Sequence, residues 1–103
     1  MPRIVVLFNL KPGVDAAAYE DWARKRDAPA VRDLRSISGF SVHRATGLLG
    51  SDAPPPYDYL EVIDIRAMDG FMEDIGSDVM QAIASEFQGF ADDPQFILTE
   101  GIA

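Results

Sequence analysis

Residues 3–9 read RIVVLFN, and this short stretch decides the fold. Its five consecutive apolar residues, Ile4 to Phe8, are followed by the turn signal Lys11-Pro12-Gly13. A strand with one face in water would alternate apolar and polar side chains, so an unbroken apolar run predicts a strand that is buried on both faces.

The segments after this strand predict a small α+β domain. Asp15 can cap a helix over residues 16–26, and Pro29 predicts a kink near Ala28 before a helical turn that runs through Leu34. Further strands are predicted at residues 40–46, 59–65 and 95–99, and a second helical region at residues 68–88 with a break at Gly76-Ser77. The order β-α-β-β-α-β predicts a ferredoxin-like protomer, in which two helical regions cover one face of a four-stranded antiparallel sheet.

Composition narrows the function classes. The 103 residues suffice for a single domain, residues 1–103, and the absence of cysteine excludes disulfides, zinc–thiolate sites and cysteine nucleophiles. A net charge of −8 argues against binding to nucleic acid or to an anionic membrane, and the longest apolar run is too short to cross a bilayer. One histidine with scattered carboxylates predicts no metal site, and no phosphate loop or dinucleotide motif is present. We therefore expect a cytoplasmic protein without metal or cofactor.

The sheet face away from the helices is predicted to be apolar as well. Alternation places on it Val5 and Leu7 from the first strand and Tyr59 and Ile63 from the third. Each such side chain left in water forgoes roughly 1.5–3 kcal/mol of burial free energy. This patch predicts a second copy of the chain as its cover, which gives a two-fold homodimer with sheet face against sheet face. The proline-rich connection at residues 47–58 is either a flap over the ligand site or over the dimer mate, or an ordinary surface loop.

Polar side chains on the same face predict a ligand site. Four fall there by alternation: Asn9, Ser41, His43 and Glu61. Polar groups enclosed among apolar ones need hydrogen-bond partners, water or a ligand, so we expect a small apolar ligand between the two sheets of the dimer. The residues expected to contact it from this face are Leu7, Ser41, Tyr59 and Ile63.

His43 is the candidate acid or base of that site, because it is the only side chain whose unperturbed pKa lies near neutrality. Glu61 is expected to orient its ring, and Asn9 to donate a hydrogen bond to a carbonyl or oxyanion. The alternative for His43 is a strand histidine that is satisfied by a backbone carbonyl or by Glu61. The alternative for Asn9 is a turn residue that bonds local backbone.

Asp27 falls on the apolar stripe of the first helix, where a carboxylate is out of place. One interpretation is that it caps the helical turn that reopens at Pro29. The other is that it reaches the rim of the ligand site beside Trp22 and Arg26, with Trp22 as a wall of that site.

The first helix and the entry to the second strand resemble those of EthD-like dimeric α/β-barrel proteins. The similar stretches are Tyr19-Glu20-Asp21-Trp22, Asp27-Ala28-Pro29-Ala30-Val31 and Ser38-Gly39-Phe40. Proteins of that group typically carry a Tyr-Trp pair, a His-x-Pro segment and a glycine–aromatic entry to strand two. Trp22, Pro29, Gly39 and Phe40 match this pattern, whereas Asp27 stands in the place of the histidine.

The rest of the chain is similar to RedY/HapK-like proteins, a branch of the same superfamily that is associated with prodigiosin-type pigment clusters. The similar segments are residues 46–49, 57–64 and 80–92. This resemblance implies a ferredoxin-like protomer in a dimeric α/β barrel with a ligand cavity in each protomer. It also implies a role in maturing or cyclising a secondary-metabolite intermediate, without assigning a catalytic residue.

Three functional hypotheses follow. The first is a cofactor-free protein of secondary metabolism that binds an apolar aromatic or polyketide-like compound and cyclises or isomerises it by proton transfer. The second is cofactor-independent oxygenation of an electron-rich aromatic compound. The third is a dimeric carrier or stabiliser of a ligand, without catalysis.

Overall fold

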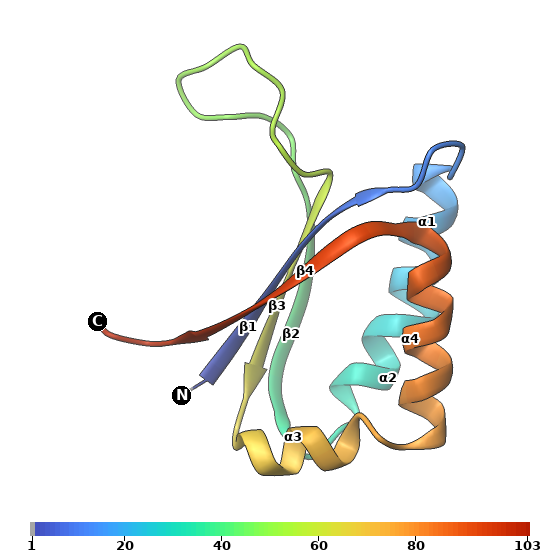
Figure 1. Ribbon diagram of the computed structural model, residues 1–103, viewed down its shortest axis with the longest axis vertical. Helices are drawn as coiled ribbons and strands as arrows, with labels where there is room; N and C mark the ends of the chain where they lie inside the picture. The colour runs from blue at the N-terminus through green and yellow to red at the C-terminus, as the bar shows by residue number, and fades with distance from the viewer. Residues whose placement is uncertain (1) are drawn as a thin grey trace.

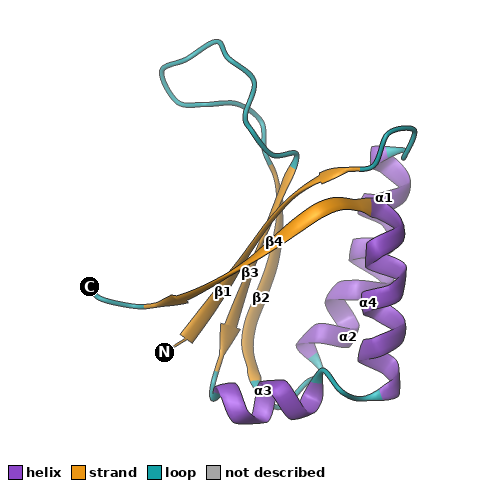
Figure 2. Ribbon diagram, viewed as in Figure 1, coloured by secondary structure: helices purple, strands orange, loops and turns teal. Residues whose placement is uncertain are grey.

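A four-stranded antiparallel sheet carries a layer of helices on one of its faces (Figure 1). The computed structural model describes residues 2–103, and its fold is ferredoxin-like, as the order of the segments predicts. The strands are Pro2–Leu10 (β1), Ile37–Arg44 (β2), Tyr59–Ile65 (β3) and Ala91–Glu100 (β4), in the sheet order β2-β3-β1-β4. The helical segments are Ala16–Trp22 (α1), the π-helical turn Ala23–Asp27 (η1), Ala28–Arg32 (α2), Met68–Asp74 (α3) and Asp78–Phe90 (α4). Figure 2 shows by colour that the helices lie together on one side of the strands.

Pro29 does not break the first helical region, because a wider turn accommodates it. Asp15 caps α1 as predicted, and its side chain accepts a hydrogen bond of 3.3 Å from the Ala17 amide. Further along, the Ala28 amide donates to the carbonyl of Ala23, five residues back, which makes η1 a π-helical turn. Pro29 has no amide hydrogen to give to an α-helical bond, so a wide turn just before it sacrifices few hydrogen bonds. The expected kink near Ala28 is therefore a π-helical turn that runs directly into α2.

The second helical region breaks at Gly76-Ser77, where the sequence predicts it. The Ser77 hydroxyl accepts a hydrogen bond of 3.3 Å from the Met80 amide and so caps α4. The strand β4 starts at Ala91, directly after α4 and earlier than expected. None of the helices within residues 2–103 is long and apolar enough to cross a membrane.

The strand registers show which side chains face the helices. Seven buried side chains of the two central strands do so: Ile4, Val6 and Phe8 from β1, and Tyr59, Glu61, Ile63 and Ile65 from β3. The prediction that Tyr59, Glu61 and Ile63 lie on the opposite face is therefore wrong. Both alternating sets of β3 side chains contain large apolar residues, so alternation alone does not show which set faces the helices. The carboxylate of Glu61 was expected on the face away from the helices, and it is instead buried against them.

Aromatic rings fill the core next to the middle of β1. The ring of Phe8 stacks on that of Tyr59 with a centroid separation of 5.7 Å. It meets Tyr19 of α1 and Phe87 of α4 edge-on, at 5.5 and 4.9 Å. Such pairs contribute about 0.5–1.5 kcal/mol each beyond their burial. This cluster sets the spacing between the sheet and both long helical regions.

The sheet face opposite the helices is largely apolar. Val5 and Leu7 lie there as predicted, together with Ser41 and His43. The register adds three aliphatic side chains to this face: Leu60, Val62 and Ile97. In a single chain these aliphatic side chains are half-buried or exposed, and the prediction that this face needs a cover agrees with their placement.

The connection between β2 and β3 extends beyond the sheet, away from the helices (Figure 1). Asn9 bonds the end of this connection that leads into β3. Its side-chain amide donates to the Pro56 carbonyl (3.3 Å), and its side-chain oxygen accepts from the Asp58 amide (2.9 Å). Asn9 therefore bonds backbone that is distant in sequence, so the prediction of a local turn is wrong. Leu49 near the tip is fully exposed, and Leu48 is 41% exposed.

Candidate functional site

An apolar cavity of about 400 Å³ lies between the sheet and the helices. Its wall comes from all four strands on one side and from α2, α3 and α4 on the other. The apolar side chains that form most of it include Ile4, Phe40, Ile63, Phe71, Ile83 and Phe87. Asp27 and Glu61 are the two carboxylic acids in this lining. The predicted ligand site lies on the opposite face of the sheet, so this cavity is a separate candidate site.

The π-helical turn places Asp27 in the cavity wall. Asp27 is the last residue of η1, and its side chain is 4% exposed. It makes no capping hydrogen bond to the start of α2 within the described chain, so the capping interpretation is wrong. Val31, one turn further along, lines the same cavity. Asp27 is therefore a wall residue of a helix–sheet cavity and not a rim residue of a site between two sheets.

Glu61 reaches the cavity from the middle of β3. It lies between Val6 of β1 and Val42 of β2 in the sheet, and it is 6% exposed. Its Oε2 atom is buried and has no hydrogen-bond partner among residues 2–103. A buried polar atom without a partner raises the free energy of the folded state by about 1–3 kcal/mol. Such an atom in a cavity wall marks a place where a ligand can supply the missing partner.

Burial raises the pKa of both carboxyl groups. The pKa of Asp27 rises to about 6 through burial and then through the nearby charge of Glu86. The pKa of Glu61 rises to about 8 through burial and then through the charge of Asp27. Near pH 7 the pair therefore holds one carboxylate, mainly at Asp27, and one carboxylic acid, at Glu61.

Tyr19 adds a neutral hydroxyl beside this pair. Its side chain is fully buried, and its hydroxyl finds no hydrogen-bond partner in the part of the chain that the structure describes. Burial, followed by the charges of Glu61 and Asp27, raises the pKa of Tyr19 well above its usual range. The hydroxyl therefore stays protonated and can donate a hydrogen bond.

A carboxylate base and a carboxylic acid in one apolar cavity can move protons on a bound molecule. At neutral pH Asp27, which has the lower pKa, is ionised and can act as the base, and Glu61, which has the higher pKa, is protonated and can act as the acid. Two carboxyl groups are fewer ligands than a structural or catalytic metal site normally uses. Within residues 2–103, no group of three or more His, Asp or Glu side chains is arranged to hold a metal ion.

The predicted acid–base histidine lies away from this cavity. His43 is exposed on the open face of the sheet, where its Nε2 atom lies 2.9 Å from Ser41 Oγ. Glu61 points to the helix face, so the prediction that it orients His43 is wrong. Leu7 and Ser41 share the open face with His43. Of the side chains predicted to contact the ligand, Ile63 lines the cavity.

Trp22 and Arg26 tie the first helical region to α4. The indole N–H of Trp22 donates to Glu86 Oε1 at 2.8 Å, and Arg26 donates to both oxygens of the same carboxylate at 3.0 and 2.9 Å. These bonds, from Arg26 first and then from Trp22, lower the pKa of Glu86 to about 2. Tyr59, the remaining predicted wall residue, donates to Glu20 at 2.6 Å and lines a separate cleft.

Two further side chains were not indicated by the sequence pattern: Tyr19, which lines the separate cleft, and Phe96, which lines the cavity. Tyr19 reads as an ordinary core residue, and nothing in its spacing marks an unpartnered hydroxyl. Phe96 of β4 lines the cavity although it is 57% exposed, which places it at the opening. The available signal was the pair of acids in otherwise apolar stretches, Asp27 on its helical stripe and Glu61 within YLEVIDI.

Comparison with known proteins agrees with this architecture. The family model described as REDY-like protein HapK matches residues 2–102. The crystal structure of HapK from Hahella chejuensis is similar, with a TM-score of 0.81 and 29% sequence identity, over 99% of this chain and 93% of HapK. No curated protein matches the chain.

Two other solved structures share the fold. An EthD family protein from Bacillus halodurans C-125 has a TM-score of 0.77 and 16% identity, over 99% of both chains. A dimeric ferredoxin-like protein of unknown function from Thermobifida fusca YX has a TM-score of 0.75 and 16% identity, over 95% of this chain and 88% of that protein. At this identity the likeness establishes the fold alone. Because the family model spans nearly its whole length, this chain belongs to the HapK family of REDY-like proteins.

Proposed function

We propose that this protein binds a small apolar compound, aromatic or polyketide-like, in the cavity between sheet and helices and isomerises or cyclises it by proton transfer, without a cofactor. The observation that carries the proposal is the pairing of Asp27 with Glu61 in an apolar wall. A cavity of about 400 Å³ lies within the usual size range of small-molecule sites. The substrate class agrees with the secondary-metabolite role that the resemblance to RedY/HapK-like proteins implies.

The pKa order assigns the two roles. Asp27 is the base, because it is largely ionised near pH 7, and Glu61 is the acid, because it is largely protonated there. Asp27 removes a proton from a carbon next to a carbonyl group while Glu61 donates a proton to the carbonyl oxygen, which gives a neutral enol. Return of the proton to a different carbon completes an isomerisation. In a cyclisation, the enol carbon attacks a second carbonyl carbon of the same molecule, the enol hydroxyl returns its proton to Glu61, and the protonated Asp27 gives its proton to the new alkoxide.

Filling the cavity from α4 is expected to weaken binding of an apolar ligand. Ala84 and Ala82 are both exposed residues of this helix, but only Ala84 lines the cavity. N-phenyl-1-naphthylamine, a neutral dye that fluoresces in apolar surroundings, serves as the probe. Ala84→Phe should weaken its binding by roughly tenfold or more, because the added ring takes up space that the dye needs.

The matched control is Ala82→Phe, which adds the same ring outside the cavity and should retain the affinity of the wild-type protein. Equal affinities in both variants would show that the dye binds elsewhere and would contradict the proposed site. Thermal unfolding of both variants separates loss of the cavity from loss of the fold.

We further propose that the open sheet face closes a homodimer. Leu7 lies near the centre of that face, opposite Leu60 on one side and Gln95 on the other. Sedimentation velocity is expected to give twice the chain mass of 11.3 kDa for the wild-type protein. Leu7→Lys should give the monomer mass, since an unpaired ammonium group cannot be buried between two apolar sheets. Val79→Lys, on an exposed position of α4, should remain dimeric, and a monomeric wild-type protein would contradict the proposal.

A further inference from the structure

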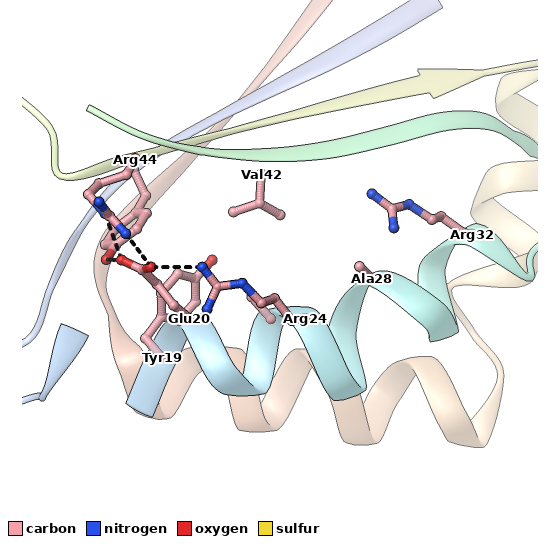
Figure 3. A pocket seen from close by; sticks show the side chains of 9 residues that line it. Tyr19, Glu20, Arg24, Ala28, Arg32, Val42 and Arg44 are labelled. Carbon is pink, nitrogen blue, oxygen red and sulfur yellow. Dashed lines mark hydrogen bonds and ion pairs between the residues drawn. The ribbon is translucent and has the colours of Figure 1, made fainter. Parts of the chain in front are cut away.

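A second hollow lies on the other side of the first helical region. It is a cleft of about 390 Å³ between the edge strand β2 and the segments α1, η1 and α2, and its floor and walls are drawn in Figure 3. Arg24, Arg32 and Arg44 line it, together with Glu20 and Tyr59. Among residues 2–103, the cleft and the apolar cavity share no lining residue.

The arginine side chains are held in place and still have free donors. Arg32 donates through Nε and Nη2 to the Phe40 carbonyl, at 3.2 and 3.0 Å. Arg44 forms a two-point pair with Glu20, in which Nε donates to Oε2 at 2.8 Å. Arg24 contacts the same carboxylate at 3.3 Å. A guanidinium group carries five N–H donors, so each of the three retains donors for a further acceptor.

The cleft is a local excess of positive charge in an acidic protein. The chain carries a net charge of −8, yet three guanidinium groups line this cleft with only one carboxylate, that of Glu20, which pairs with Arg24 and Arg44. The hydroxyl of Tyr59 also donates to Glu20, so this carboxylate already receives bonds from Arg24, Arg44 and Tyr59. The uncompensated charge therefore favours an anion from outside the chain.

The shape of the cleft selects the kind of anion. Figure 3 shows the guanidinium groups of Arg24 and Arg32 at the two sides of a gap that has Val42 on one wall and Ala28 on the other. Small and apolar side chains thus form the middle, and charged groups form the ends. An apolar body can lie between Val42 and Ala28 while its charged group meets the arginine at one end.

We infer that this cleft binds a small organic anion, an aromatic carboxylate, whose carboxylate group is held by Arg24 at one end of the cleft. Planar guanidinium groups suit this task because they bind carboxylates through two parallel hydrogen bonds. The site is separate from the apolar cavity, so this inference does not depend on the chemistry proposed for Asp27 and Glu61.

Calorimetric titration with sodium benzoate at pH 7 and low salt tests the assignment. Arg24→Gln is expected to weaken benzoate binding by roughly tenfold, the effect of losing a hydrogen bond to a charged group. Lys25→Gln is the matched control. Lys25 is the next residue, it also pairs with an acid four positions back (2.8 Å to Asp21), and it does not line the cleft. Its removal should leave the affinity within about twofold of the wild-type value, because it is screened surface charge.

Three results would overturn the inference. Equal weakening by Arg24→Gln and Lys25→Gln would reduce the effect to general surface charge. Inorganic phosphate that binds more tightly than benzoate would show a site for a compact anion instead of an aromatic carboxylate. Loss of benzoate binding in Ala84→Phe would place benzoate in the apolar cavity. Retained affinity in Ala84→Phe supports two separate sites, whatever the outcome for proton transfer in the apolar cavity.

Discussion

Replacing Asp27 by Asn is expected to slow proton exchange on a simple aromatic ketone by about 10²–10⁴-fold, the usual contribution of a positioned acid or base. The test substrate is 2-tetralone, a neutral bicyclic ketone with acidic hydrogens next to its carbonyl group. Exchange of these hydrogens for deuterium is followed by NMR in heavy water. Asparagine preserves the shape of the side chain and removes the base, so binding should persist while exchange is lost. Glu61→Gln should have a similar effect, because an amide cannot protonate the carbonyl oxygen.

The exchange rate of the wild-type protein should pass through a maximum between about pH 6 and pH 8. Below this window Asp27 becomes protonated, and above it Glu61 loses the proton that it must donate. Asp33→Asn, an exposed aspartate just after α2, is the matched control and should keep the full rate. His43→Gln should keep it as well, because the imidazole lies on the other face of the sheet.

Other outcomes of the same measurement favour the other functional hypotheses. Binding of 2-tetralone without exchange in the wild-type protein would contradict proton transfer and favour a carrier. Oxygen consumption with a phenolic compound would favour cofactor-independent oxygenation.

Glu61→Gln is expected to stabilise the protein strongly in mild alkali. The carboxyl group of Glu61 has a pKa of about 8 in the folded protein and about 4.5 in the unfolded chain. Below pH 4.5 it is protonated in both states, so its contribution to stability is fully present there. Between pH 4.5 and pH 8 the unfolded chain releases the proton and the folded protein keeps it, so stability falls as the pH rises. The total loss is on the order of 3–5 kcal/mol.

Glutamine has no proton to lose, so the variant should escape this decline. Denaturant unfolding followed by circular dichroism from pH 5 to pH 9 should show similar stability at pH 5 and a widening advantage of the variant towards pH 8.5. Each kcal/mol corresponds to about 4–8 °C in a domain of this size, so the melting temperature should rise by at least about 10 °C at pH 8.5. Glu73→Gln, at an exposed position of α3, is the control and should follow the wild-type curve.

Of the carboxyl groups of Glu20, Glu86 and Asp27, only that of Asp27 titrates within part of this pH window. The pKa values of Glu20 and Glu86 are lowered to about 2 by their hydrogen bonds to Arg44 and Arg26, so their contributions change only below about pH 4.5. Asp27 acts in the same direction as Glu61, between its usual pKa of 3.8 and about 6. Parallel curves for the wild-type protein and Glu61→Gln would contradict the buried, protonated state of Glu61.

Strand order and helix placement were predictable because they depend on patterns with few alternatives. The apolar run at Ile4 to Phe8 is compatible with few structures other than a strand with two apolar faces. Ser77 marks the start of α4, because its side chain makes a local capping hydrogen bond. The order of segments then leaves the ferredoxin-like topology as the natural solution. Element ends were less accurate, since β2 and β4 begin three and four residues earlier than the residues 40 and 95 expected from the sequence.

The location of the site was not predictable from the pattern, because it depends on one choice of face. Tyr59, Glu61 and Ile63 alternate with Leu60 and Val62, and both sets contain apolar residues of similar size. General experience places a glutamate away from the core, and here the carboxyl group lies inside it. That single reversal moves the candidate site from the dimer face to the helix face. It also separates Glu61 from His43 and joins it to Asp27.

The sequence left the position of Asp27 open for a related reason. A carboxylate two residues before a proline is a common helix cap, and the capping interpretation assumes that the helix restarts at Pro29. The structure keeps the helix continuous through η1, so no new helix start needs a cap. A π-helical turn has no reliable signature in a single sequence, and its effect on side-chain direction emerges only in three dimensions.

The π-helical turn between Trp22 and Pro29 also bears on how this protein can evolve. Such a turn accommodates one residue more than an α-helical turn, and each residue rotates a helix by about 100°. Loss of a single codon in this segment would redirect Asp27 while the flanking segments kept their places against the sheet. Deletion or insertion of one codon would thus remove Asp27 from the cavity wall or place it there, while the rest of the fold stayed the same. Descendants of a common ancestor with this fold can therefore diverge in chemistry through the length of one turn.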